Sequence, residues 1–215
     1  MHEEKPVDLH TLTRNSTEDN KMVETLDIST LAVGSNVLII GGRSMGKSTL
    51  LCDLLFKRRN NFTDGEALIG GRTRDSEVSY LPPHRVHLLM DNDCHFSTTS
   101  VWIGEEVGRK VLSSPELSSL LDGPSEVYIT AQCMHCVPAA IRLKFDMTFI
   151  LRHSANIRKL YDQYFTAFQS LADFRLEFDR LTAEFGCVCV DRERNVYAYR
   201  AEPHTPKFMI RASKL

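Results

Sequence analysis

A glycine-rich segment carries the residues whose types and spacing most clearly indicate chemistry. It follows an apolar run, matches the pattern G-x-x-x-x-G-K-S, and leads into a helical pattern. Glycines let backbone N–H groups point inward, and a helix start adds partial positive charge at the same place, so the segment predicts a phosphate-binding loop. We expect the loop to comprise Gly41, Gly42, Arg43, Ser44, Met45, Gly46, Lys47, Ser48 and Thr49.

Two side chains of this loop have specific expected tasks. The Lys47 ammonium would place a point charge on the β- and γ-phosphates of ATP, and the Ser48 hydroxyl would be a ligand to Mg²⁺. GTPases, nucleotide kinases and motor ATPases all use such a loop, so the remaining sequence must separate them.

The rest of the chain disfavours two of these classes. Guanine selectivity usually needs an Asn-Lys-x-Asp segment, whereas residues 143–146 read Leu-Lys-Phe-Asp and lack the asparagine. A nucleotide or small-molecule kinase remains the alternative, although the basic residues 70–74 are not followed by a lid-like insertion. A third hypothesis is a binding module whose nucleotide is structural.

A possible metal-binding acid follows the apolar residues 86–90. There the sequence reads Asp91-Asn92-Asp93, and a carboxylate at the end of a buried strand can hold Mg²⁺ through water. Asp91 is our first choice as this Walker-B acid and Mg²⁺ ligand, and Asp93 is the alternative. Asn92, which separates them, is a poor base. An ordinary Asp-Asn-Asp turn is the other interpretation.

Two further polar residues are candidates for catalysis. Gln132 ends an apolar run at residues 127–130, where it could sense the γ-phosphate or position water. Arg142 lies on a short helical segment between two expected strands, from which it could reach a neighbouring subunit's nucleotide as an arginine finger. From the residue type alone, an ordinary surface ion-pair partner is the better interpretation of Arg142.

Short apolar runs alternating with helical patterns predict an α/β fold with a mostly parallel sheet flanked by helices. The last two runs, separated by residues 191–195, predict a C-terminal β-hairpin. In the last helix, Phe174, Phe178, Leu181 and Phe185 form one apolar face that we expect in the core. The expected strands are residues 36–40, 67–69, 86–90, 127–130, 147–151, 187–190 and 196–199, and the expected helices are residues 47–59, 104–112, 156–165 and 171–185.

Composition limits the class of protein. The 215 residues are 42% hydrophobic and carry 26 basic and 28 acidic side chains, a formal net charge of -2. This predicts one globular domain, residues 29–215, behind a flexible arm, residues 1–28. The sequence has no apolar run long enough to span a membrane and no secretion signal, so we expect a soluble intracellular protein. A basic coat for nucleic acid is excluded, which leaves local patches.

The six cysteines are most simply interpreted as reduced thiols in an intracellular protein. Cys133 and Cys136 form a C-x-x-C pattern that Cys187 and Cys189 could complete as a zinc site. The spacing of the second pair does not fit a zinc ribbon. Buried thiols are therefore the preferred interpretation.

The order of these segments resembles the genome-packaging ATPases of large DNA viruses, the poxvirus and iridovirus type within the FtsK/HerA superfamily. The resemblance depends on the progression from Gln132 to Pro138 to Arg142 to Asp146, and it continues through residues 160–165 and 185–191. It covers roughly residues 33–200. One departure is that the family usually has paired acids after the Walker-B strand, whereas Asn92 interrupts the pair here.

The resemblance implies a RecA-like P-loop core that works as a homo-oligomeric ring and uses ATP hydrolysis to drive double-stranded DNA into a preformed capsid. It implies that Lys47 and Ser48 bind Mg·ATP, that Gln132 is the sensor, and that Arg142 acts in trans. The expected partners are duplex DNA, contacted without regard to sequence, and a capsid or portal component. The expected location is the host cytoplasm, a viral factory or the virion.

Overall fold

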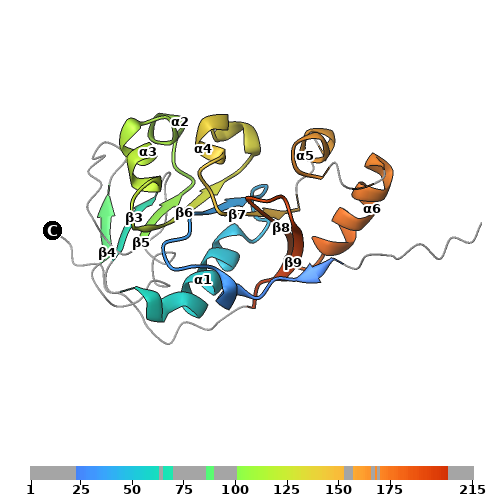
Figure 1. Ribbon diagram of the computed structural model, residues 1–215, viewed down its shortest axis with the longest axis horizontal. Coiled ribbons are helices and arrows are strands. Elements are labelled where there is room, and N and C mark those ends of the chain that lie inside the picture. Colours follow the sequence, from blue (N-terminus) through green and yellow to red (C-terminus); the bar gives the residue numbers. More distant parts are fainter. Residues whose placement is uncertain are drawn as a thin grey trace, which may run out of the picture.

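The computed structural model describes residues 23–62, 65–69, 86–89, 101–152, 157–165, 168 and 170–202. Within these residues the chain forms one mostly parallel sheet with helices on both faces, which confirms the predicted α/β fold (Figure 1). The strands lie in the order β1-β9-β8-β7-β2-β6-β5-β3-β4. Their bounds are β1 (Glu24–Thr25), β2 (Val37–Ile40), β3 (Gly65–Ile69), β4 (Val86–Leu89), β5 (Val101–Glu105), β6 (Glu126–Ala131), β7 (Met147–Leu151), β8 (Gly186–Asp191) and β9 (Val196–Arg200).

The helices connect these strands. None of those in the described part of the chain combines the length and apolar composition that crossing a bilayer requires. The α-helices are α1 (Lys47–Arg58), α2 (Arg109–Leu112), α3 (Pro115–Leu121), α4 (Ala139–Arg142), α5 (Ile157–Tyr164) and α6 (Leu171–Leu181), and the 3-10 helices are η1 (Ile28–Thr30), η2 (Arg59–Asn61) and η3 (Met134–Cys136).

The strand β2 lies at the centre of the sheet because it is apolar on both faces. It pairs in parallel with β6 on one side and with β7 on the other. All four of its residues are fully buried. Continuous apolar runs of this kind are typical of parallel strands covered by helices on both sides.

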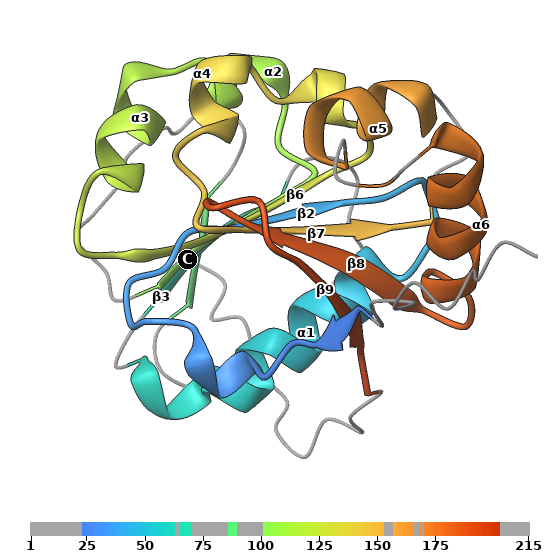
Figure 2. The same ribbon diagram turned by 45° about the vertical axis from the view of Figure 1, so that its right-hand side comes forward.

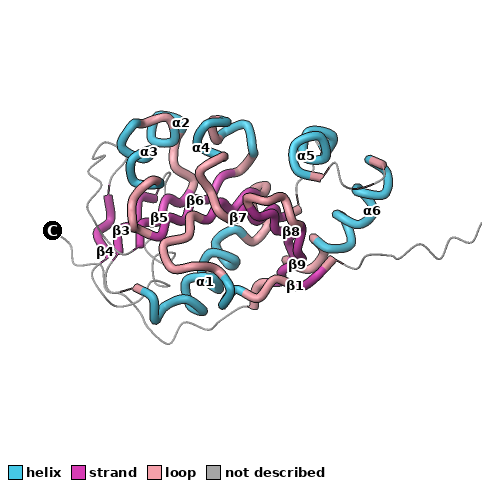
Figure 3. The backbone as a smooth tube through the Cα atoms, viewed as in Figure 1, coloured by secondary structure: helices cyan, strands magenta, loops and turns pink. Residues whose placement is uncertain are grey.

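Alternating side chains of β2 divide the core into two layers. Leu38 and Ile40 pack on the side that α2 to α6 cover, whereas Val37 and Ile39 pack against α1. Figures 1 and 2 show α1 below the sheet, with α2 to α5 above it. Figure 3 shows the strands as a continuous layer between them.

The predicted C-terminal hairpin is present. Strands β8 and β9 are antiparallel, and β8 also pairs antiparallel with β7. Asp191 holds the connecting turn, because its carboxylate accepts hydrogen bonds from the backbone and side-chain nitrogens of Asn195. Since β8 runs opposite to β7, the start of β8 lies at the sheet edge where the parallel strands end.

The prediction of a helix over residues 104–112 is wrong in its first half. Residues Val101–Glu105 form strand β5, and α2 begins only at Arg109. Gly104, which we placed at the helix start, lies in the strand, where an added Cβ would approach the Trp102 ring to 2.7 Å. The helix α3, which we did not predict, begins at Pro115 with the Ser114 hydroxyl accepting from the Leu117 N–H.

The boundary predicted for the N-terminal arm lies too late in the chain. Residues 1–22 lie outside the described part, but β1 pairs with β9, and Leu26 and Ile28 are buried. The guanidinium of Arg58 donates to the carbonyl oxygens of residues 28, 31 and 32 and forms a buried ion pair with Glu126. The domain therefore includes the segment from residue 24 onward.

Candidate functional site

The glycine-rich loop connects β2 to α1, as its sequence pattern predicts. The backbone takes positive φ angles at Ser44 (61°) and at Gly46 (92°), where glycine avoids the strain that a side chain would add. The first helical hydrogen bond runs from the Leu50 N–H to the Gly46 carbonyl. The N-terminus of α1 therefore points at the loop, an arrangement suited to an anion.

The side chain of Lys47 is buried and already has partners. Its Nζ lies 3.0 Å from Glu106 Oε1 and donates to the Gly42 carbonyl at 3.1 Å. Carboxylate and carbonyl oxygens thus surround the ammonium. An incoming phosphate would have to displace Glu106 from Lys47.

The second loop side chain, Ser48, meets the other member of the same acidic pair. Its hydroxyl donates to Glu105 Oε1 at 2.5 Å. A hydroxyl and a carboxylate are oxygen donors that suit Mg²⁺, which is usually held by one or two carboxylates together with substrate phosphates. The residues present therefore fit a Mg²⁺ ion, with Ser48 and Glu105 as its protein ligands.

Three residues hold Glu106 in position: Lys47, Thr130 and Gln132. Its φ is 49°, its N–H donates to Thr130 Oγ1 at 2.9 Å, and its Oε2 accepts from Gln132 Nε2 at 3.2 Å. Burial raises the pKa of the Glu106 carboxyl, but the hydrogen bonds from Lys47 and Gln132 outweigh this effect and leave the pKa below its ordinary value. The carboxylate is therefore charged at neutral pH.

These groups meet because of strand order. Strands β2, β6 and β5 are adjacent and parallel, so their carboxyl ends share one sheet edge, where α/β proteins bind ligands. The loop follows β2, Gln132 follows β6, and Glu105 ends β5 with Glu106 directly after it. The structure thus brings the predicted Gln132 into contact with a glutamate that our sequence analysis missed.

The strand that precedes the acids proposed from the sequence does not border the strand that carries the phosphate loop. Asp91 and Asp93 lie outside the described residues, but β4, which precedes them, is the outermost strand, with β3, β5 and β6 between it and β2. Four strand spacings of about 4.8 Å place β4 roughly 19 Å from β2. Glu105 and Glu106 are thus the acids that the described part of the chain places beside the phosphate loop. The signal was present, because residues 101–106 are an apolar run followed by adjacent acids.

Arg142 does not contact its own phosphate loop. It ends α4, is partly buried, and donates from Nη1 to the Met134 carbonyl at 2.9 Å. It also lines a cavity of about 250 Å³ with Thr148, Tyr164 and Asp191. Thr148 is the second residue of β7 and Asp191 ends the antiparallel β8, so this cavity lies toward the opposite end of the sheet.

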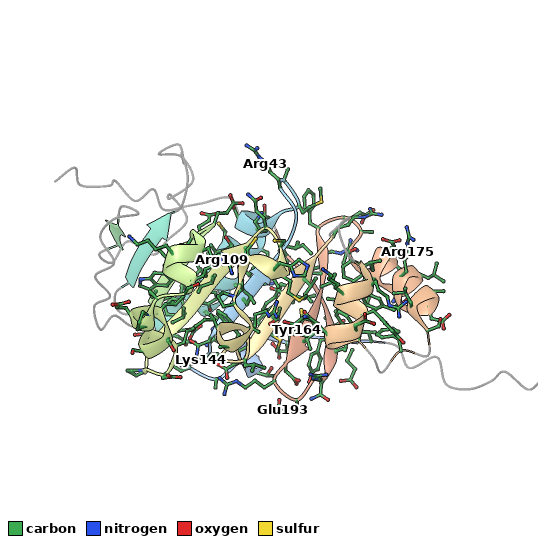
Figure 4. All side chains as sticks on the ribbon, turned by 90° about the horizontal axis from the view of Figure 1, so that it is seen from above. Arg43, Arg109, Lys144, Tyr164, Arg175 and Glu193 are labelled. Atoms are coloured by element: carbon green, nitrogen blue, oxygen red, sulfur yellow. The ribbon has the colours of Figure 1, made fainter. Side chains whose placement is uncertain are left out.

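Several basic residues that could form a local patch for nucleic acid instead make contacts within the fold. Lys57 pairs with Asp53, Arg58 is buried against Glu126, and the Arg59 guanidinium lies over the Phe56 ring. Arg158 pairs with Asp162, and Arg72 and Arg74 lie outside the described residues. Figure 4 shows Arg43 extending from the loop end of the molecule, with Lys144 and Glu193 at the other end.

The cysteines considered for zinc are divided between two environments. Cys187 and Cys189 are buried in β8, while Cys133 is partly exposed and Cys136 is exposed. In the part of the chain that the structure covers, no three His, Cys, Asp or Glu side chains are grouped to hold a metal ion.

Comparisons with known proteins bear on the fold. No protein-family model matches the chain. It is 26% identical to uncharacterized protein 075L of Invertebrate iridescent virus 6, covering 74% of this chain and 70% of that one. It is also similar to two solved structures of B204, one from Sulfolobus turreted icosahedral virus 2 and one from Sulfolobus turreted icosahedral virus. The genome packaging NTPase B204 from Sulfolobus turreted icosahedral virus 2, in complex with AMPPCP, has a TM-score of 0.55 at 12% identity, covering 81% of this chain and 100% of that chain. The structure described as B204, the DNA-packaging ATPase, has a TM-score of 0.56 at 11% identity with the same coverage. The chain therefore has the fold of a viral genome-packaging NTPase, the fold that its sequence resemblance predicts.

Proposed function

We propose that the chain is an ATPase that hydrolyses Mg·ATP and, as a homo-oligomeric ring, drives double-stranded DNA into a viral capsid. The observation that carries the proposal is the junction of loop and acids, where Lys47 contacts Glu106 and Ser48 contacts Glu105. The likeness to packaging NTPases supports the choice of process, because one of those structures was solved with AMPPCP and another is described as a DNA-packaging ATPase.

The residues of the junction have distinct proposed roles. The loop N–H groups and Lys47 would bind the β- and γ-phosphates once the ammonium leaves Glu106. Ser48 and Glu105 would hold Mg²⁺, which neutralises charge on the phosphate oxygens when it is bound. Together these groups would stabilise the negative charge that develops on the phosphate oxygens as the γ-phosphoryl group is transferred to water.

Glu106 would act on the attacking water. The water oxygen forms a bond to the γ-phosphorus as the bond from that phosphorus to the bridging oxygen of ADP breaks. The water proton passes to the Glu106 carboxylate, which is ionised at neutral pH. Gln132, which donates to the same carboxylate, would orient it and report the state of the γ-phosphate.

Arg142 has a proposed role between subunits. It lies away from its own loop, so it would stabilise the transition state in a neighbouring ring member. We expect Arg142→Ala to abolish turnover while ATP binding is retained. In rings mixed from Arg142→Ala and Lys47→Ala chains, recovery of activity would support action in trans, and complete inactivity at every mixing ratio would contradict it.

DNA would be contacted through its backbone and without sequence preference. A chain with a net charge of -2 must use a modest patch that the ring repeats around the duplex. The affinity of such contacts for DNA falls as the salt concentration rises.

Phosphate release from Mg·ATP tests the proposal directly. We expect release to rise when long duplex DNA is added, more at low than at moderate salt, and to disappear in Lys47→Ala. Release that is indifferent to DNA but rises with a phosphoryl acceptor would indicate a kinase instead. Binding without release would indicate a structural nucleotide, and undiminished hydrolysis by Lys47→Ala would contradict the site.

A further inference from the structure

An aromatic side chain lies exposed beside the phosphate loop. Phe185 is 59% exposed, although the helical period of the sequence predicts it as part of the core. Helix α6 ends at Leu181, so Phe185 belongs to the turn that leads into β8. Its ring lies so close to the loop that a Cβ added at Gly46 would come within 2.8 Å of Phe185 Cδ1.

The backbone of this turn is held in an unfavourable conformation. Glu184 and Phe185 have φ angles of 48° and 62°, which place two consecutive residues with side chains in the left-handed region. Such conformations cost free energy and are concentrated at functional sites. A glycine at position 185 would avoid the cost, so the aromatic ring there is not explained by backbone geometry.

The surrounding contacts fix the turn. The Thr182 hydroxyl donates to the Phe178 carbonyl, the Gly186 N–H donates to the Ala183 carbonyl, and Glu184 pairs with Arg200 at 2.8 Å. These contacts hold the turn in place. The Phe185 ring therefore has a fixed position, and the described residues leave most of it exposed.

The position of Phe185 relative to the acids suggests its ligand. In the order β8-β7-β2-β6-β5, the turn before β8 and the acids after β5 lie on opposite sides of the loop. A nucleotide whose γ-phosphate lay near Lys47 and Glu106 would extend its other end away from β5, toward β8. An exposed ring at that place can cover one face of a base, since aromatic rings stack on every nucleobase.

We propose that Phe185 is a nucleobase-binding residue that stacks on the adenine of ATP. This inference rests on the proposed function and adds to it the site of base recognition. Because stacking tolerates every base, Phe185 would supply affinity more than a choice among nucleotides. The phosphate tail would be bound independently of the ring.

Binding of two ligands to the full chain separates these contributions. We would measure the Kd of Mg·ADP and of inorganic tripolyphosphate by calorimetry for the wild type, Phe185→Gly and Phe185→Tyr. Phe185→Gly should weaken ADP binding by about 10-fold or more and leave tripolyphosphate binding unchanged. Phe185→Tyr should bind ADP like the wild type. Glycine suits the φ at this position, so the variant should fold.

A matched control is Leu176→Ala, which removes another exposed apolar side chain, 77% exposed on α6. It should leave both Kd values unchanged. Equal ADP affinity in the wild type and Phe185→Gly would overturn the inference, and so would an equal loss for both ligands. If the wild type bound neither ligand, the proposed function itself would fail.

Discussion

The two sides of the phosphate loop differ in how they are prepared for a ligand. On the side of β5 and β6, Glu105, Glu106 and Gln132 are polar and already hydrogen-bonded to the loop or to one another. On the side of β8, the Phe185 ring is exposed at the end of a strained turn. By our proposal, ATP would have to break contacts on the first side, whereas on the second side it would only have to cover the ring.

This difference indicates that the two sides contribute to different steps, one to hydrolysis and the other to nucleotide binding. The polar side is positioned by sheet register, which places strand ends within hydrogen-bonding distance, and such precision is what charge stabilisation and proton transfer require. The apolar side is positioned by a turn, and stacking tolerates small displacements better than a hydrogen bond does. We therefore expect changes on the β5 side to affect turnover and changes on the β8 side to affect affinity.

The largest expected effect comes from Glu106→Gln. Removal of the carboxylate base should lower ATP hydrolysis by about 100-fold or more, with ATP binding retained, because a general base commonly contributes this much. Steady-state phosphate release and calorimetric ADP binding would measure the two quantities. The doubly substituted control, Asp91→Asn with Asp93→Asn, should stay within a few-fold of the wild type. A large loss in that control with normal Glu106→Gln activity would return the role to the earlier acids.

A smaller loss is expected from Thr130→Val, which removes the acceptor of the Glu106 N–H. Because Glu106 would keep its charge but lose its positioning, kcat should fall roughly 10-fold while KM changes little. Thr130→Ser retains the hydroxyl and should restore kcat. A loss in both variants, or an equal change of kcat and KM, would argue for a general packing role of this buried residue.

A pH-dependent difference in stability should appear only on the polar side. The folded pKa of Glu106 is below its ordinary value of 4.5, so its ion pair stabilises the fold above that value and is lost as pH falls through the lowered pKa. The Tm of Glu106→Gln should therefore lie below that of the wild type at pH 7, by no more than about 2–4 °C, and the gap should close at acid pH.

Phe185→Gly provides the comparison for that measurement, since position 185 carries no charge. Its Tm difference from the wild type should not vary over the same pH range. A gap for Glu106→Gln that widened in acid would contradict the assigned ion pair.

The smallest effect concerns Cys52, one turn into α1. Burial, followed by the charges of Glu105 and Asp53, raises the pKa of the Cys52 thiol to about 12. Iodoacetamide at pH 8 should therefore modify exposed Cys136 before Cys52, as read by mass spectrometry of peptides. In Glu105→Gln the rate at Cys52 should rise by a few-fold. Equal rates at Cys52 and Cys136 in the wild type would contradict the assigned environment.

Much of the central fold follows from local sequence. The apolar runs at β2, β6 and β7 and the hairpin of β8 and β9 are separated by clear turn signals, and the structure places them as predicted. Strand β5 was missed because Gly104 and the charged residues after it fit a helical pattern. The acids that we now propose, Glu105 and Glu106, were then missed as well. Their place beside the loop depends on which strand lies beside β6, and strand order is set by packing between segments far apart in sequence.

Phe185 was misplaced for a different reason. It continues the spacing of Phe174 and Phe178, both of which are buried on α6, so periodicity alone puts it on the same face. The chain leaves the helix after Leu181 and turns through two left-handed residues before the buried Gly186. The spacing of apolar residues along the sequence does not show where the backbone changes direction.

A crystal structure of the chain grown with Mg²⁺ and AMPPCP would test the account most directly. We predict that Lys47 leaves Glu106 for the terminal phosphates, that Ser48 and Glu105 hold the cation, and that the adenine lies on Phe185. A loop left empty at saturating nucleotide, with Lys47 still on Glu106, would contradict the account.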